Sequence, residues 1–157
     1  MSIEISNESA QTVDEDAILA LARHLFDRLY LHPQTDLSIV LVDEEAMAAL
    51  HQQWMDEPGA TDVMSFPMDE LRPGSEDAPS AEGLLGDIVV CPQVASRQAA
   101  RGGHSVGDEI LLLVTHGVLH LLGYDHEEPD EKAEMFALQR ALLTEHLGRP
   151  SPRETDS

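Results

Sequence analysis

Three histidines within eleven residues have the spacing that could support chemistry in this chain. His116 and His120 are four residues apart inside an apolar run, and His126 follows six residues after His120. Four-residue spacing places two side chains on one face of a helix, with their Cβ atoms about 5–6 Å apart. Gly123 can end such a helix in a left-handed conformation and turn the chain back. The third imidazole could then reach the same point as the other two.

Converging imidazoles are typical of a catalytic metal site. Three neutral histidines on one side of a cation leave its fourth position open, as in catalytic zinc sites. From Ile110 to Leu122 only Thr115, His116 and His120 carry polar side chains, so this helix should be buried and central. Buried polar groups need partners. Each histidine could instead form a hydrogen bond in the core, but three at this spacing favour one Zn²⁺ per chain, although nickel or copper would also suit imidazole.

The segment reads H-x-x-x-H-x-x-G-x-x-H, which is the spacing of the long zinc-protease (metzincin) signature with one difference. Those proteases carry a glutamate general base directly after the first histidine, whereas this chain has Gly117. Glycine cannot accept a proton, so a base must come from elsewhere. The candidate catalytic residues are His116, Asp125 beside the third histidine, and Asp87 in a predicted strand. Either carboxylate could orient a histidine or act as a base.

Composition indicates one acidic globular domain. Of the 157 residues 42% are hydrophobic, and 30 Asp and Glu against nine Lys and Arg give a formal net charge of −21. Such a surface repels polyanions at long range, so an enzyme acting on nucleic acid would need local cations or the metal itself. The single cysteine, Cys91, excludes an internal disulfide, and the acidic N-terminal segment is unlike a secretory signal. We therefore expect a cytoplasmic location.

Hydrophobic patterns predict a single α/β domain over residues 1–148, with a small mixed sheet of about four strands and about five helices. Strands are expected near residues 3–5, 37–42, 62–66 and 84–91, and helices near 15–29, 43–54, 92–101, 105–122 and 130–147. The acidic segment 69–83, rich in Pro, Gly and Ser, is expected to be a mobile surface loop, and residues 149–157 a disordered tail.

Several residues mark where these helices should begin. Thr12 and Glu15 have capping-box spacing before the first helix. Asp43 and Ser105 are candidate N-caps, and Pro92 suits the first turn of the helix that it opens.

Three segments together resemble the YbeY family of bacterial metal-dependent endoribonucleases. They are TDVMSFP at 61–67, LGDIVVC at 85–91 and HGVLHLLGYDH at 116–126, in that family's order. The resemblance implies a compact α/β domain whose zinc is held by His116, His120 and His126, and cleavage of single-stranded RNA. It also implies a role in 3′-end maturation of small-subunit ribosomal RNA and in ribosome assembly and quality control. The partners would be the rRNA precursor and the small subunit or its assembly factors, without DNA or a membrane.

The chain departs from that family's pattern at one position. Many members carry an arginine after the aromatic residue that precedes the first of these segments, whereas here Met55 follows Trp54. Methionine cannot bind phosphate, so another arginine must substitute or this branch works differently. Arg97 and Arg101 are four residues apart on a predicted helix and could share a face. They are candidate RNA contacts, although two such arginines are more often simply solvated.

Two other functions remain open. A peptide hydrolase with a displaced base would use the same metal site. A non-catalytic ribosome assembly factor would use zinc only to stabilise its fold, and the net charge and Met55 both favour it somewhat.

Overall fold

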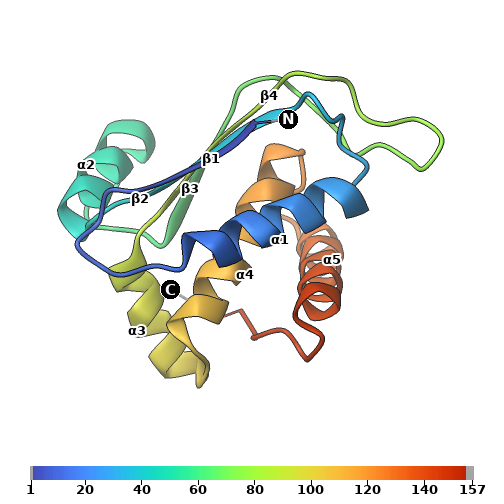
Figure 1. Cartoon of the computed structure of the whole chain (residues 1–157). Coiled ribbons are helices and arrows are strands. Elements are labelled where there is room, and N and C mark those ends of the chain that lie inside the picture. Colours follow the sequence, from blue (N-terminus) through green and yellow to red (C-terminus); the bar gives the residue numbers. More distant parts are fainter. Residues whose placement is uncertain (1, 155–157) are drawn as a thin grey trace.

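A four-stranded mixed sheet carries the fold in the computed structural model of the chain, which describes residues 2–154 (Figure 1). The strands are β1 (Ser2–Asn7), β2 (Asp36–Leu41), β3 (Val63–Pro67) and β4 (Leu84–Val90), in the order β1-β2-β4-β3. β1, β2 and β4 are parallel, and β3 pairs antiparallel with β4. The predicted α/β class with a small mixed sheet is confirmed.

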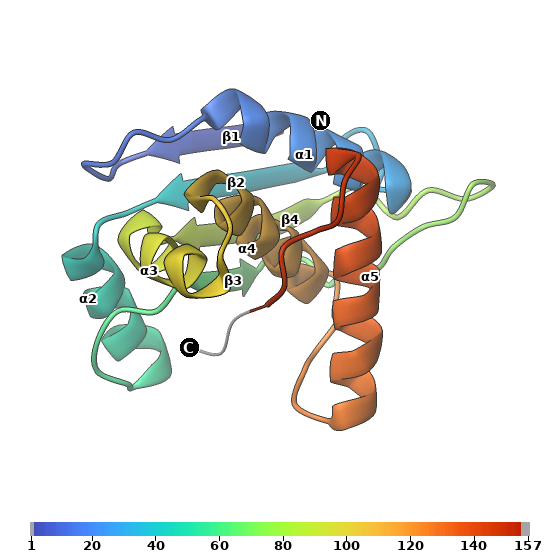
Figure 2. The ribbon, with the colours of Figure 1, turned by 90° about the horizontal axis from the view of Figure 1, so that it is seen from below.

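The helices divide unequally between the two faces of the sheet. They are α1 (Glu15–Arg28), α2 (Glu44–Met55), α3 (Pro92–Gly102), α4 (Val106–Leu121) and α5 (Pro129–Leu147). Figures 1 and 2 show α1, α3, α4 and α5 on one side of the sheet and α2 toward the other. On the side of α2, Met47 packs in a small cluster with Met64 and Val89. The main core lies on the opposite face.

Helix α4 is the centre of that core, as the sequence predicts. It contacts α1, α3, α5, β3 and β4, and every side chain from Glu109 to Thr115 is buried. Gly117 lets it approach the sheet closely, because a Cβ atom there would lie 3.0 Å from two carbon atoms of Ile88. Position 117 thus faces β4. A glutamate in place of this glycine would point into the core, so the sheet contact accounts for the glycine.

Of the four predicted helix starts, two agree with the structure, one agrees in position only and one differs. Asp43 is the N-cap residue of α2, but its side chain makes no capping hydrogen bond there and accepts instead from the Ala10 N–H and the Gln93 amide. The Ser105 hydroxyl accepts from the Asp108 N–H at 3.1 Å and caps α4, and Pro92 opens α3. The cap of α1 is Asp14, whose carboxylate accepts from the Ala17 N–H at 3.1 Å, and not Thr12. Aspartate is at least as good an N-cap as threonine.

The long connection between β3 and β4 contains neither helix nor strand, but it is held at several points. The Gly74 N–H donates to the Leu29 carbonyl and the Ser80 N–H to the Tyr30 carbonyl, both at 2.9 Å. Leu71 is buried in the main core. The mobility predicted for residues 69–83 stays a prediction.

Residues 149–154 lie against α4 and α5, unlike the disordered tail that composition predicts. The Arg149 guanidinium forms an ion pair with Asp108 at 2.6 Å, and the Ser151 N–H donates to Thr144 Oγ1 at 3.1 Å. Pro152 is buried. These contacts hold the segment 149–154 against the helices. The rest of the predicted tail, residues 155–157, lies outside the described residues.

Candidate metal centre and cavity

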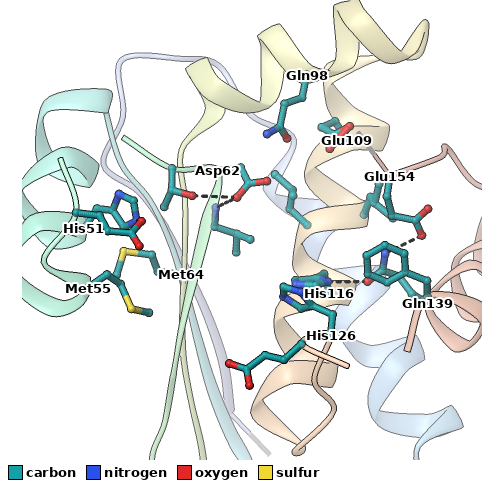
Figure 3. Close-up of a pocket in the computed structure, with 17 residues that line it drawn as sticks. His51, Met55, Asp62, Met64, Gln98, Glu109, His116, His126, Gln139 and Glu154 are labelled. Atoms are coloured by element: carbon teal, nitrogen blue, oxygen red, sulfur yellow. Dashed lines mark hydrogen bonds and ion pairs between the residues drawn. The ribbon is translucent and has the colours of Figure 1, made fainter. Parts of the chain in front are cut away.

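A cavity of about 600 Å³ lies between α4 and the start of β3 and is closed by α5, α3 and the end of α2 (Figure 3). His116 and His126 both line it. The cavity therefore lies directly beside two of the three predicted site histidines.

The three histidines gather at the C-terminal end of α4, as their spacing predicts. The ring centroids of His116 and His120 are 6.3 Å apart with nearly parallel planes. The His126 centroid lies 5.2 Å from that of His116 and 6.2 Å from that of His120. Gly123 has a φ of +98°, the left-handed conformation that favours glycine, and it turns the chain so that His126 comes back to the helix.

Two of the imidazoles are oriented through Nδ1. His116 Nδ1 lies 3.0 Å from Gln139 Oε1, and His120 Nδ1 lies 3.0 Å from the Tyr124 carbonyl oxygen. Both partners are acceptors, so Nδ1 carries the hydrogen in each neutral ring and Nε2 keeps its lone pair. Burial lowers the pKa of His116, and His126 and His120 lower it further while Gln139 opposes them. Metal-binding histidines commonly have this arrangement.

The donor chemistry fits a metal better than the present distances do. Residues 2–154 contain no group of three or more His, Cys, Asp or Glu side chains whose geometry could hold a metal ion as it stands. The imidazoles would have to draw together, and His126 is exposed on the turn after α4. Three imidazoles, two of which have Nδ1 engaged and Nε2 available, nevertheless match the donor set of a zinc site. The zinc prediction stays a prediction.

The structure does not bring Asp87 to the histidines. Successive side chains of a strand point to opposite faces, and Ile88 is the β4 residue that packs against α4 at Gly117. Asp87 shares the other face with Val89, which packs in the cluster of α2. It is absent from the lining of the cavity.

Asp125 lies next to the site but is used locally. Its Oδ1 accepts from the His126 N–H at 2.7 Å, which fixes the turn that carries this histidine. The side chain lines a second cavity, of about 340 Å³, together with Arg72 and Tyr124. The structure therefore supports a positioning role for Asp125 and does not place it in the larger cavity.

Five carboxylates line the larger cavity, and among the described residues no lysine or arginine does. They belong to Glu57, Asp62, Glu109, Glu127 and Glu154. Glu109 had a signal in the sequence, because it is seven residues before His116 and thus on the same face of α4. Gln139 and Glu154 had none, because only the packing of α5 and the C-terminal segment brings them there.

The two predicted RNA-binding arginines lie on the exposed face of α3, outside the cavity. Arg97 forms a bidentate ion pair with Glu44, at 2.7 and 3.0 Å, and Arg101 is exposed. Two further cations were missed by sequence reasoning, one at the histidine turn and one on α5. The Arg72 guanidinium lies against Gly123, and Lys132 Nζ is 5.4 Å from the centroid of the Phe136 ring, which lines the cavity.

The fold and the site define a small α/β protein with three imidazoles, at the end of a buried helix, beside an acidic cavity. A family model described as "Endoribonuclease YbeY" matches residues 4–147, and the chain belongs to this family. The predicted membership is confirmed.

Curated relatives match the chain over nearly its whole length. A protein of Renibacterium salmoninarum is 66% identical over 155 residues, covering 99% of both chains. One of Micrococcus luteus is 60% identical, covering 99% of this chain and 98% of its own. Both are named Endoribonuclease YbeY. A solution structure of a Thermotoga maritima protein is 30% identical, with a TM-score of 0.63, and covers 93% of this chain and 89% of its own.

Proposed function

We propose that this protein is a zinc-dependent endoribonuclease that cleaves single-stranded RNA. The observation that carries the proposal is the trio His116, His120 and His126, gathered beside a cavity with Nδ1 of two rings engaged. Membership of a family described as an endoribonuclease supplies the substrate class. A peptide hydrolase has less support, since position 117 faces the sheet and cannot present a base to the cavity.

The three imidazoles would hold one Zn²⁺ through their free nitrogens. A zinc ion held by three histidines supplies an activated water and positive charge for a phosphodiester oxyanion. Gln139 and the Tyr124 carbonyl keep two of the rings in the required orientation. Asp125 holds the turn on which the third ring is placed.

The lining of the cavity determines how RNA can enter. Five carboxylates without a neighbouring lysine or arginine in the described lining repel a phosphate. Cationic contacts to the RNA backbone therefore come from outside this lining, where Arg72 lines the second cavity beside Gly123 and Lys132 lies over the ring of Phe136. Of the five carboxylates in the cavity, Asp62 acts on the charge of His116 and Glu127 follows His126 in the sequence, so these two are the candidate general bases.

We also propose the biological setting that the family resemblance implies. The substrate is a precursor of small-subunit ribosomal RNA, cleaved near its 3′ end in the cytoplasm. The small subunit or its assembly factors are the partners. Among residues 2–154 no helix combines the length and the apolar character needed to cross a membrane.

Metal content and RNA cleavage test this function together. Elemental analysis of the purified protein should find one zinc per chain. A fragment of small-subunit rRNA precursor should be cleaved, and a chelator should stop the cleavage. His116→Ala should abolish both properties while the far-UV circular dichroism spectrum is retained. His32→Ala is the matched control, because this histidine lies on the connection after α1 and does not line the cavity.

Other outcomes of these two tests would support a different function. Zinc without RNA cleavage, together with unfolding of the His116 variant, would identify a zinc-stabilised ribosome assembly factor. The formal charge of −21 and the methionine at position 55 are the features that favour this alternative. Chelator-sensitive cleavage of denatured protein would identify a peptide hydrolase. Absence of any bound metal would contradict the proposal at its base.

A further inference from the structure

The end of the cavity away from the histidines holds a buried amide without a partner. Gln98 of α3 is 1% exposed and lines the cavity. Its Nε2 is buried and has no hydrogen-bond partner among residues 2–154. An unsatisfied buried donor costs about 1–3 kcal/mol, so such groups are rare in a folded protein unless a ligand or water completes them. Gln98 therefore indicates a ligand group that accepts a hydrogen bond.

A buried carboxylate lies at the same end of the cavity. Glu109 of α4 is 1% exposed, and its Oε1 lies 2.6 Å from His104 Nε2. Burial raises the pKa of Glu109, and the nearby His104 opposes this shift. Each carboxylate oxygen has two lone pairs, and within residues 2–154 only Oε1 has a hydrogen-bond partner. Figure 3 shows Gln98 and Glu109 together at the end of the cavity opposite His116 and His126.

The space between these two ends suits one nucleotide. Glu109 and His116 are seven residues apart on one helix, which separates their Cα atoms by about 10 Å. The walls between them include the apolar side chains of Val63, Met64 and Leu112. Apolar walls with a few convergent polar groups are typical of sites for small-molecule ligands.

We propose that Gln98 and Glu109 form a subsite for a guanine base of the RNA, next to the phosphodiester that is cleaved at the histidines. This inference rests on the proposed function. Guanine O6 accepts the hydrogen bond of the Gln98 amide. Guanine N1–H and N2–H both donate to the Glu109 carboxylate, a bidentate and charge-assisted contact. Adenine, cytosine and uracil cannot present two adjacent nitrogen donors to a carboxylate beside an acceptor, and bases in single-stranded RNA are read on this edge.

Binding of free nucleosides tests the subsite without a phosphate or a metal. The chelator-treated protein is titrated with guanosine, inosine, adenosine, cytidine and uridine, and binding is followed by saturation-transfer NMR. Guanosine should bind about tenfold more tightly than the other bases, as expected for one good bidentate contact. Inosine lacks the N2 amine and should lose most of that advantage.

Two variants assign the preference to the residues named. Gln98→Met keeps the volume and removes the amide, and Glu109→Gln keeps the shape and removes the charge. Each should weaken guanosine binding about tenfold, with an unchanged thermal transition showing that the fold is intact. Gln93→Met is the matched control, because Gln93 is on the same helix and donates to Asp43 outside the cavity. Equal binding of all nucleosides, absence of binding, or unchanged binding in both variants would overturn the subsite.

Cleavage assays separate this inference from the function on which it rests. Zinc-loaded protein is given two oligonucleotides of equal length, one with a single guanosine and one without. Faster cleavage at the guanosine, lost in Gln98→Met, supports the subsite. Equal cleavage of both would contradict the subsite and leave the endoribonuclease standing. Guanosine-selective binding without cleavage of either RNA would contradict the nuclease proposal alone.

Discussion

Gln139 fixes the ring of His116 through a single hydrogen bond. Removing this hydrogen bond should therefore affect metal binding more than it affects the fold. The Oε1 of Gln139 accepts from Nδ1 at 3.0 Å, and its Nε2 donates to Glu154 at 3.1 Å. Gln139→Met keeps the size of this buried side chain and removes the acceptor. The variant should bind Zn²⁺ about 10- to 100-fold more weakly, the usual effect of losing such a support. Competition with a chromophoric chelator measures this affinity.

Gln139→Glu is the control for that variant, because it keeps an acceptor for His116 Nδ1. It should retain most of the zinc affinity even though it places a carboxylate beside Glu154. Equal zinc affinity of the Met variant and the wild type would show that the hydrogen bond of Gln139 does not support metal binding.

Arg72 is the better candidate for the RNA contact that Met55 cannot make. Its guanidinium donates to the Leu71 and Leu122 carbonyls and lies against Gly123 in the histidine turn. Arg72→Gln should weaken RNA binding and lower the slope of log affinity against log salt by about one, as loss of one phosphate contact does. Filter binding at several salt concentrations measures both quantities.

The double variant Arg97→Gln/Arg101→Gln tests the contacts expected from the sequence alone. The Arg97 guanidinium is already paired with Glu44, so we expect a smaller change in the salt slope than for Arg72→Gln. A larger change in the double variant would place the RNA on α3 instead.

Among the elements, α4 depends on one glycine for its distance from the sheet. A methyl group at position 117 would meet three carbon atoms of Ile88 at 3.0 to 3.2 Å. Gly117→Ala should therefore destabilise the fold by about 1–3 kcal/mol, the usual cost of overpacking a core. Urea denaturation followed by circular dichroism measures the free energy of unfolding.

Gly107→Ala is the matched control on the same helix. Its Cβ would meet only Ser105 Oγ, at 3.9 Å, and alanine is the better helix former by up to about 1 kcal/mol. Since no closer contact is present among residues 2–154, the control should be as stable as the wild type or more so. A Gly117 variant as stable as the Gly107 variant would show that α4 can move away from β4 at little cost.

Local spacing made α4 and its neighbours predictable from the sequence. The apolar run, the cap at Ser105, Pro92 and Gly123 each act within a few residues, and the structure has them in the predicted roles. The order of the strands in the sheet could not be predicted from the sequence. Nothing in the strand sequences specifies that β4 lies between β2 and β3, because strand order depends on connections and on packing.

The same distinction separates the parts of the candidate site. Histidines at helical spacing could be recognised because the helix alone brings two of them together. Asp87 sits one residue before Ile88, and only the pairing of β4 decides which of the two faces α4. Gln98, Gln139 and Glu154 come from three separate segments that meet by tertiary packing. Their types and spacing carry no pattern that would select them.

At the scale of the whole molecule, acidic side chains pair with four of the nine basic ones. The pairs are Arg28 with Glu145, Arg97 with Glu44, Arg140 with Glu154 and Arg149 with Asp108. RNA therefore approaches a surface that is net negative and in which several guanidinium groups are already engaged. Long-range repulsion is screened within about 10 Å at 0.1 M salt, so contacts at the cavity should decide binding.

Substitution of Glu154 can show whether RNA binding depends on the charge in the cavity or on the net charge of the protein. Its carboxylate lies in the cavity and holds the Arg140 guanidinium with hydrogen bonds of 2.6 to 3.1 Å. Glu154→Gln removes one charge there and weakens that pair, so RNA affinity should rise roughly two- to fivefold. Glu4→Gln, on the exposed edge strand β1, changes the net charge equally. Equal gains for both variants in fluorescence anisotropy would mean that the overall field governs binding, whereas a gain for Glu154→Gln alone would show that the RNA binds at the cavity.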